Sequence, residues 1–118
     1  MERDNLALTK SKRFAVRIIN LYKYLCDEKK EFILSKQILK SGTSIGANAR
    51  EASKAQSKKE FIAKMNISLK EAEETCYWLE ILEESNIIDT NAFDSIYADA
   101  NELVAIFTSI VKTSNTNK

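Results

Sequence analysis

The chain contains no proline and only two glycines, Gly42 and Gly46, among its 118 residues. Proline and glycine are the residues that most strongly interrupt regular backbone structure. Long segments can therefore continue unbroken, which favours long helices. Both glycines lie in one stretch, KSGTSIGANAREA at residues 40–52, and that stretch needs its own explanation.

Apolar residues recur with the helical period in four segments, at about residues 5–29, 33–55, 58–85 and 91–113. In the first segment Leu8, Ala15 and Ile19 widen the apolar face. The connections are short, and short connections between long helices place neighbours antiparallel. We therefore expect an all-α fold, an antiparallel up-down-up-down four-helix bundle in one domain over residues 1–118. The polar tail at 114–118 is expected to be flexible.

The third segment has a defined start. Ser57 is followed three residues later by Glu60, which is the spacing of a capping box. In that motif the serine caps an early backbone amide and the glutamate reaches back. The pattern predicts a helix that begins at residue 58.

Composition argues against several functional classes. No window reaches the roughly 18 consecutive apolar residues of a membrane span, and no secretory signal is visible at the N-terminus. We expect a cytoplasmic protein without a membrane partner. Histidine is absent, which removes the commonest general acid–base group and metal ligand. Cys26 and Cys76 are not spaced as metal ligands. We expect no catalytic residue, metal or cofactor, and no enzymatic activity.

The glycine stretch resembles a phosphate-binding loop only superficially. Such a loop needs a preceding strand, and here the helical seam of Ile38, Ile45 and Ala49 runs straight through. Each glycine inside a helix costs about 1 kcal/mol relative to alanine, so two of them need a reason. Close approach of another helix supplies one. That helix could belong to the same chain or to a second subunit, so Gly42 and Gly46 are candidate subunit contacts.

Charge is divided unevenly along the chain. Residues 1–60 carry 14 Lys/Arg and 7 Asp/Glu, whereas residues 61–118 carry 4 and 10. Six basic residues of the first two predicted helices could contact phosphate groups. They are Arg13, Arg17, Lys36, Lys40, Arg50 and Lys54. A solvated basic face and a protein-binding face stay open as alternatives, because no known nucleic-acid motif is present.

The third predicted helix carries a second stripe away from its core seam. Its members are Ile67, Glu71, Glu74, Trp78 and Ile81. Apolar residues with a charged rim are typical of a subunit interface. The alternative is that Trp78 packs at a corner of the bundle within one chain. A head-to-tail contact between this acidic face and the basic face of the next subunit would close a homo-oligomeric ring if the rotation permits.

Three motifs resemble a known family. They are SGTSIGAN-x-REA at 41–52, SKKEF at 57–61 and LKEAEET-x-YWLE at 69–80. They resemble the bacterial four-helix bundle proteins encoded in intervening sequences of 23S rRNA genes, over roughly residues 10–112. The broader family includes accessory proteins of diversity-generating retroelements. The resemblance implies a small bundle that assembles into a ring, a homopentamer, and RNA or a reverse transcriptase as partners.

Two functions follow as hypotheses. The first is a non-enzymatic homo-oligomeric bundle that is RNA-associated or acts as a scaffold. The second is an accessory module that binds a partner protein, for example a reverse transcriptase, with no direct role for RNA.

Overall fold

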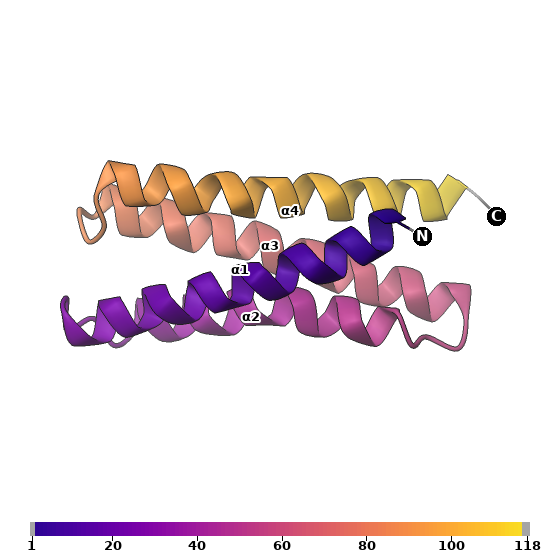
Figure 1. The fold of residues 1–118 in the computed structure, drawn as a ribbon, viewed down its shortest axis with the longest axis horizontal. Helices are drawn as coiled ribbons and strands as arrows, with labels where there is room; N and C mark the ends of the chain where they lie inside the picture. Colours follow the sequence, from indigo (N-terminus) through magenta and orange to yellow (C-terminus); the bar gives the residue numbers. More distant parts are fainter. Residues whose placement is uncertain (1, 117–118) are drawn as a thin grey trace.

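The computed structural model describes residues 2–116 and consists of four α-helices (Figure 1). The helices are α1 (Glu2–Asp27), α2 (Leu34–Ala52), α3 (Lys58–Glu84) and α4 (Thr90–Thr116). Consecutive helices run in opposite directions along the long axis in Figure 1. No strand occurs within residues 2–116. The expected all-α fold with four helices is confirmed.

The last helix continues further than the sequence pattern indicated. Residues 114–116 were expected to belong to a flexible tail, but α4 extends through Thr116. Arg3 in α1 gives a physical reason, because its Nη1 donates to Thr113 Oγ1 at 3.1 Å and ties the end of α4 to α1. Residues 117 and 118 of the expected tail lie outside the described part of the chain.

The N-termini of α2 and α3 are capped in different ways. At α3 the Ser57 hydroxyl accepts a hydrogen bond from the Glu60 backbone N–H at 3.0 Å, the serine half of the predicted capping box. At α2 the cap is a carboxylate. Glu31 accepts from the backbone N–H groups of Ile33, Leu34 and Ser35 at 3.2, 3.0 and 2.7 Å. Partial burial alone would raise the pKa of Glu31, but these three donors outweigh it and the pKa is lowered.

Removal of this carboxylate cap is expected to destabilise the bundle. We expect Glu31→Ala to cost about 1 kcal/mol at neutral pH, a typical value for a lost helix cap. Because the folded pKa of Glu31 lies below the ordinary value of 4.5, its contribution is present above that value. The contribution is lost as pH falls through the folded pKa.

Chemical denaturation at neutral and acid pH measures this difference. Glu28→Ala removes a neighbouring exposed carboxylate from the same turn and serves as the control. If Glu28→Ala and Glu31→Ala cost the same, the cap contributes nothing specific.

The two glycines bring α1 and α2 together. A Cβ atom built on Gly42 would lie 2.6 Å from Ile18 Cγ1, and one built on Gly46 would lie 3.1 Å from Ser11 Oγ. Close packing within one chain therefore accounts for both glycines. Gly42 is buried under α1 and is not available to a second subunit, which corrects the expectation of a subunit contact there. Gly46 is half-buried, and a subunit contact at Gly46 stays a prediction.

The core lies along the bundle axis and includes a polar layer between α2 and α3. The Ser68 hydroxyl donates to the Ile45 carbonyl oxygen at 2.8 Å. The Thr75 hydroxyl lies 2.9 Å from that of Ser41. All three hydroxyl-bearing residues are buried and each has a hydrogen-bond partner, so none of the hydroxyls is left unsatisfied in the core. These bonds also fix the register of α2 against α3.

Candidate interaction surfaces

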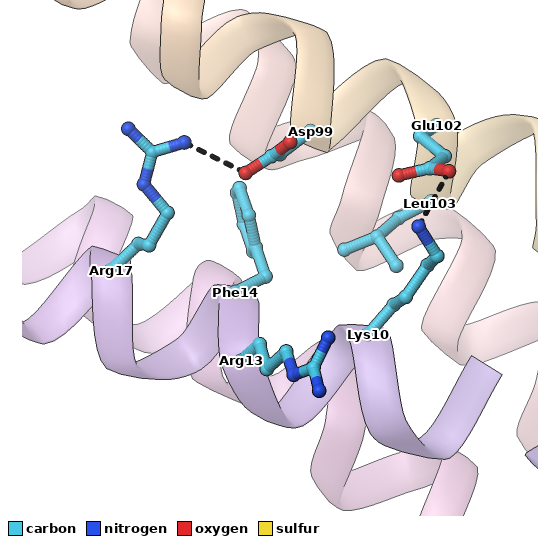
Figure 2. Close-up of a pocket in the computed structure, with 7 residues that line it drawn as sticks. All are labelled: Lys10, Arg13, Phe14, Arg17, Asp99, Glu102 and Leu103. Carbon is cyan, nitrogen blue, oxygen red and sulfur yellow. Dashed lines mark hydrogen bonds and ion pairs between the residues drawn. The ribbon is translucent and has the colours of Figure 1, made fainter. Parts of the chain in front are cut away.

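Arg17, a candidate RNA or partner contact, makes an ion pair within the chain. Its Nη1 lies 2.7 Å from Asp99 Oδ2 on α4 (Figure 2). Two turns earlier in α1, Lys10 Nζ lies 2.8 Å from Glu102 Oε2. Part of the charge asymmetry between the two halves of the chain is therefore neutralised inside the fold. The Arg17 side chain is still 41% exposed, so a phosphate or partner contact there stays a prediction.

Arg13 lies between these two bridges on α1. It makes no ion pair with any residue in 2–116, and in Figure 2 its guanidinium group points away from Asp99 and Glu102. It lines a cavity of about 270 Å³ at the seam between α1 and α4, whose apolar walls include Phe14 and Leu103. Arg13 therefore lines the α1–α4 seam, whereas Arg50 of α2 lines a different groove, between α1 and α2.

The four remaining basic residues are exposed, and none of them has an ion-pair partner among the described residues. We call Lys36, Lys40, Arg50 and Lys54 the basic edge. Lys54 lies beyond the end of α2, in the turn that leads to α3, because α2 ends at Ala52. Lys58 and Lys59 follow this turn at the start of α3, and both are exposed. These two lysines directly follow Ser57 and were not among the predicted contacts.

The basic edge is not one continuous surface. Arg50 lines the groove between α1 and α2 together with Lys12. Lys40 lies on the side of α2 that faces α3. Its charge lowers the pKa of Glu71, but two larger effects raise that pKa. Those larger effects are partial burial of Glu71 and then the charge of Glu74, so the pKa of Glu71 is raised overall.

The predicted stripe on α3 is partly embedded in the bundle. Trp78 packs against the core, as the corner interpretation held, and its Nε1 donates to Glu74 Oε2 at 3.0 Å. Its ring also meets that of Tyr77 edge to face, with 5.1 Å between ring centroids. Ile67 and Tyr77 remain 39% and 54% exposed, which is more than core packing explains. Glu71 and Ile81 are half-buried.

A groove on the outer side of α1 and α2 was not predicted from the sequence. It has a volume of about 410 Å³ and is lined by Leu8, Lys12, Ala15, Thr43, Gly46, Ala47, Arg50 and Glu51. The sequence signal for it was the widened apolar face of the first helix, which the periodicity alone assigned to the core. Ile19, on that same face, is 38% exposed.

The described residues contain no metal-ligand cluster, and one of the two cysteines has a raised pKa. Within residues 2–116 there is no group of three or more Cys, Asp or Glu side chains that could hold a metal ion. Burial, and then the charges of Glu80 and Glu73, raise the pKa of the Cys76 thiol to about 11. A thiol with that pKa stays protonated at neutral pH and is a poor nucleophile. No helix in the described residues is long and apolar enough to cross a membrane.

The fold is a small four-helix bundle whose outer faces carry both charged and apolar residues. The family described as "23S rRNA-intervening sequence protein" matches residues 3–109, and the chain belongs to this family. A comparison with curated proteins gave no match. A crystal structure of a protein with unknown function from the S23 ribosomal protein family of Bacteroides thetaiotaomicron VPI-5482 is similar throughout. It is 55% identical, with a TM-score of 0.92 over 93% of this chain and 98% of the other.

Proposed function

We propose that the protein is a non-enzymatic, cytoplasmic, homo-oligomeric scaffold that associates with RNA through the basic edge. The observation that carries this proposal is the contrast between two sets of cations. Lys10 and Arg17 of α1 are neutralised by carboxylates of α4, whereas the basic edge is exposed and unpaired within residues 2–116. Unpaired cations release bound counterions from a polyanion and so supply its affinity. Because the family is connected with 23S rRNA genes, we propose RNA as the polyanion that binds.

Self-association is the second part of the proposal. Ile67 and Tyr77 of α3 are exposed apolar residues beside the carboxylates of Glu71 and Glu74, and a second copy could cover them. The resemblance to ring-forming relatives supports a closed ring, with five subunits as the expected number. A ring would repeat the basic edge around its circumference and so bind one RNA at several points.

Charge reversal at the basic edge tests the RNA contact. We expect Lys36→Glu, Lys40→Glu and Lys54→Glu together to weaken RNA retention by at least about 10-fold. The slope of log K against log salt concentration should decrease in magnitude by about 2, because each phosphate contact with single-stranded RNA contributes roughly 0.7 to that slope. Filter binding at several salt concentrations measures both quantities.

The matched control reverses three exposed lysines elsewhere, Lys23, Lys29 and Lys112, and so changes the net charge equally. Equal losses in both variants would show that only net charge matters. Retention indifferent to the basic-edge changes would reject the RNA contact.

A second candidate function is an accessory module for a partner protein. One observation favours it, because the turn between α1 and α2 exposes Phe32 and Ile33 by 53% and 75%. An apolar turn of this kind fits a protein better than RNA. This candidate gains support if the basic-edge variant keeps its RNA retention while Phe32→Ser with Ile33→Ser abolishes capture of a reverse transcriptase.

A further inference from the structure

The seam between α1 and α4 contains two cavities that meet at Arg17. The first has a volume of about 270 Å³ and is lined in part by Arg13, and the second has a volume of about 420 Å³. Arg17 lines both cavities. The second has apolar walls that include Leu21 of α1, Ile88 of the α3–α4 turn and Ile96 of α4. The seam is therefore one groove with a cationic end and an apolar end, and the apolar end is large enough for a small organic group.

Arg17 keeps hydrogen-bond donors available for a ligand. Its Nη1 donates to Asp99 Oδ2 at 2.7 Å and to the Ser95 carbonyl oxygen at 3.3 Å, and its Nη2 donates to Ser95 Oγ at 3.1 Å. These bonds use both N–H groups of Nη1 and one of Nη2. The Nε N–H and the second Nη2 N–H lie together on the other edge of the guanidinium, as a parallel pair that suits a phosphate. The ion pair with Asp99 therefore orients Arg17 without using up its donors.

Arg13 supplies a second cation at the same end. It precedes Arg17 by one helical turn, about 6 Å along α1. Arg13 is exposed and has no ion-pair partner within residues 2–116. Its guanidinium points away from Asp99 and Glu102 in Figure 2, but exposed side chains commonly change rotamer when a ligand binds. Because Lys10 and Arg17 are matched by Glu102 and Asp99, Arg13 leaves this end with a net positive charge.

The apolar end suits a flat ring with a polar edge. Tyr24 is 43% exposed and lines the second cavity. Lys29 Nζ lies over one face of the Tyr24 ring, 5.9 Å from its centroid, which leaves the opposite face for stacking. Asn20 also lines this cavity, and its amide can both donate and accept hydrogen bonds. Aromatic stacking and hydrogen bonds to the ring edge are the means by which proteins hold unpaired nucleobases.

The two ends are separated by a suitable distance. With a rise of about 1.5 Å per residue, Tyr24 lies about 10 Å beyond Arg17 along α1, a distance that one nucleotide spans from phosphate to base. The one further carboxylate, Asp89, lines only the second cavity. Its Oδ1 accepts from the Ala92 backbone N–H at 2.7 Å and caps α4. Negative charge from Asp89 is therefore at the end where the base would lie, away from the phosphate.

We propose that the α1–α4 seam binds a nucleotide, with its phosphate on Arg13 and Arg17 and its base in the cavity beside Tyr24. A free nucleoside monophosphate and an unpaired nucleotide of RNA offer this same chemistry. The site is separate from the basic edge, so the inference does not depend on the proposed function. It gives a role to the two arginines of α1 that the basic edge leaves out.

Isothermal titration calorimetry with adenosine monophosphate tests this site. Arg17→Lys keeps the positive charge but loses the parallel pair of donors, and we expect it to weaken binding at least about 10-fold. Tyr24→Ala should weaken binding at least about 5-fold through lost stacking, whereas Tyr24→Phe keeps the ring and should bind as the wild-type chain does. Arg50→Lys makes the matched change at an exposed arginine outside the seam and should leave binding unchanged.

Several outcomes would overturn the inference. The first is a wild-type chain that does not bind adenosine monophosphate at millimolar concentration. The second is inorganic phosphate that binds as tightly as the nucleotide, because the base would then contribute nothing. The third is a Tyr24→Ala variant of unchanged melting temperature that binds like the wild-type chain. An equal loss in Arg17→Lys and Arg50→Lys would show that the Arg17 donors are not the contact.

A competition arm distinguishes the two sources of the nucleotide. A short single-stranded oligoadenylate that displaces adenosine monophosphate assigns the site to RNA, and binding without such competition assigns it to free nucleotides. Either result supports the site. If adenosine monophosphate does not bind while the basic-edge variant still loses RNA retention, this inference fails and the proposed function stands. If adenosine monophosphate binds while the basic-edge variant keeps its RNA retention, the reverse holds.

Discussion

Phe107→Ala is expected to lower the free energy of unfolding by about 3–5 kcal/mol, the range for large aromatic truncations in a core. Phe107 is 0% exposed and is the largest fully buried side chain of the described chain. Its removal costs the transfer of the ring and leaves a cavity that four long helices cannot easily close. Urea denaturation with linear extrapolation, at one fixed protein concentration, measures the loss.

Phe32→Ala is the matched control because it removes the same atoms from an exposed position. Phe32 is 53% exposed in the turn between α1 and α2. We expect its truncation to change stability by less than about 0.5 kcal/mol, as for most surface substitutions. A loss at Phe32 as large as the loss at Phe107 would contradict this assignment of the core.

The number and order of the helices could be predicted because they depend on signals between residues that are close in sequence. The absence of proline, the apolar period and the Ser57 cap each depend on residues within a few turns of one another. The end of α4 could not be found in this way. The polar residues 114–116 give no helical signal, and the hydrogen bond from Arg3 to Thr113 joins opposite ends of the sequence.

The candidate surfaces were predicted only to the level of single helices. A helical wheel places Arg17 on the outside of α1, but it does not show that Asp99 of α4 lies beside it. The same limit hid the groove, since Leu8 and Ala47 become neighbours only when α1 crosses α2. The α3 stripe was visible because all its members belong to one helix. The rotation of each helix against its neighbours is therefore the information that sequence periodicity lacks.

That rotation is tested most directly where α1 crosses α2. Gly42→Ala is expected to cost about 1–3 kcal/mol, as overpacking usually does. Alanine is intrinsically about 1 kcal/mol better than glycine in a helix, so the expected loss must exceed this gain. The new Cβ would lie 2.6 and 2.8 Å from the two γ carbons of Ile18. A β-branched side chain in a helix has one strongly preferred rotamer and cannot turn away. Thermal and urea denaturation measure the loss.

Gly46→Ala is the control in the same helix. Its Cβ would meet the Ser11 hydroxyl at 3.1 Å, and a hydroxyl can rotate. The helical preference for alanine should then offset the tighter contact, and stability should change little. If both substitutions stabilise the protein by the same amount, the close approach of α1 to α2 at Gly42 is wrong.

A double-mutant cycle with Ile18→Ala identifies the cause of the loss at Gly42. Ile18→Ala alone should cost about 2–5 kcal/mol because it leaves a cavity in the core. It also removes both γ carbons that the new methyl group would strike, and leaves Cβ at 3.1 Å. The double variant should therefore cost less than the sum of the single variants, by about 0.5–3 kcal/mol for residues in direct contact. Strict additivity would mean that the two residues do not touch, and the packing of α1 on α2 would have to be placed elsewhere along the helices.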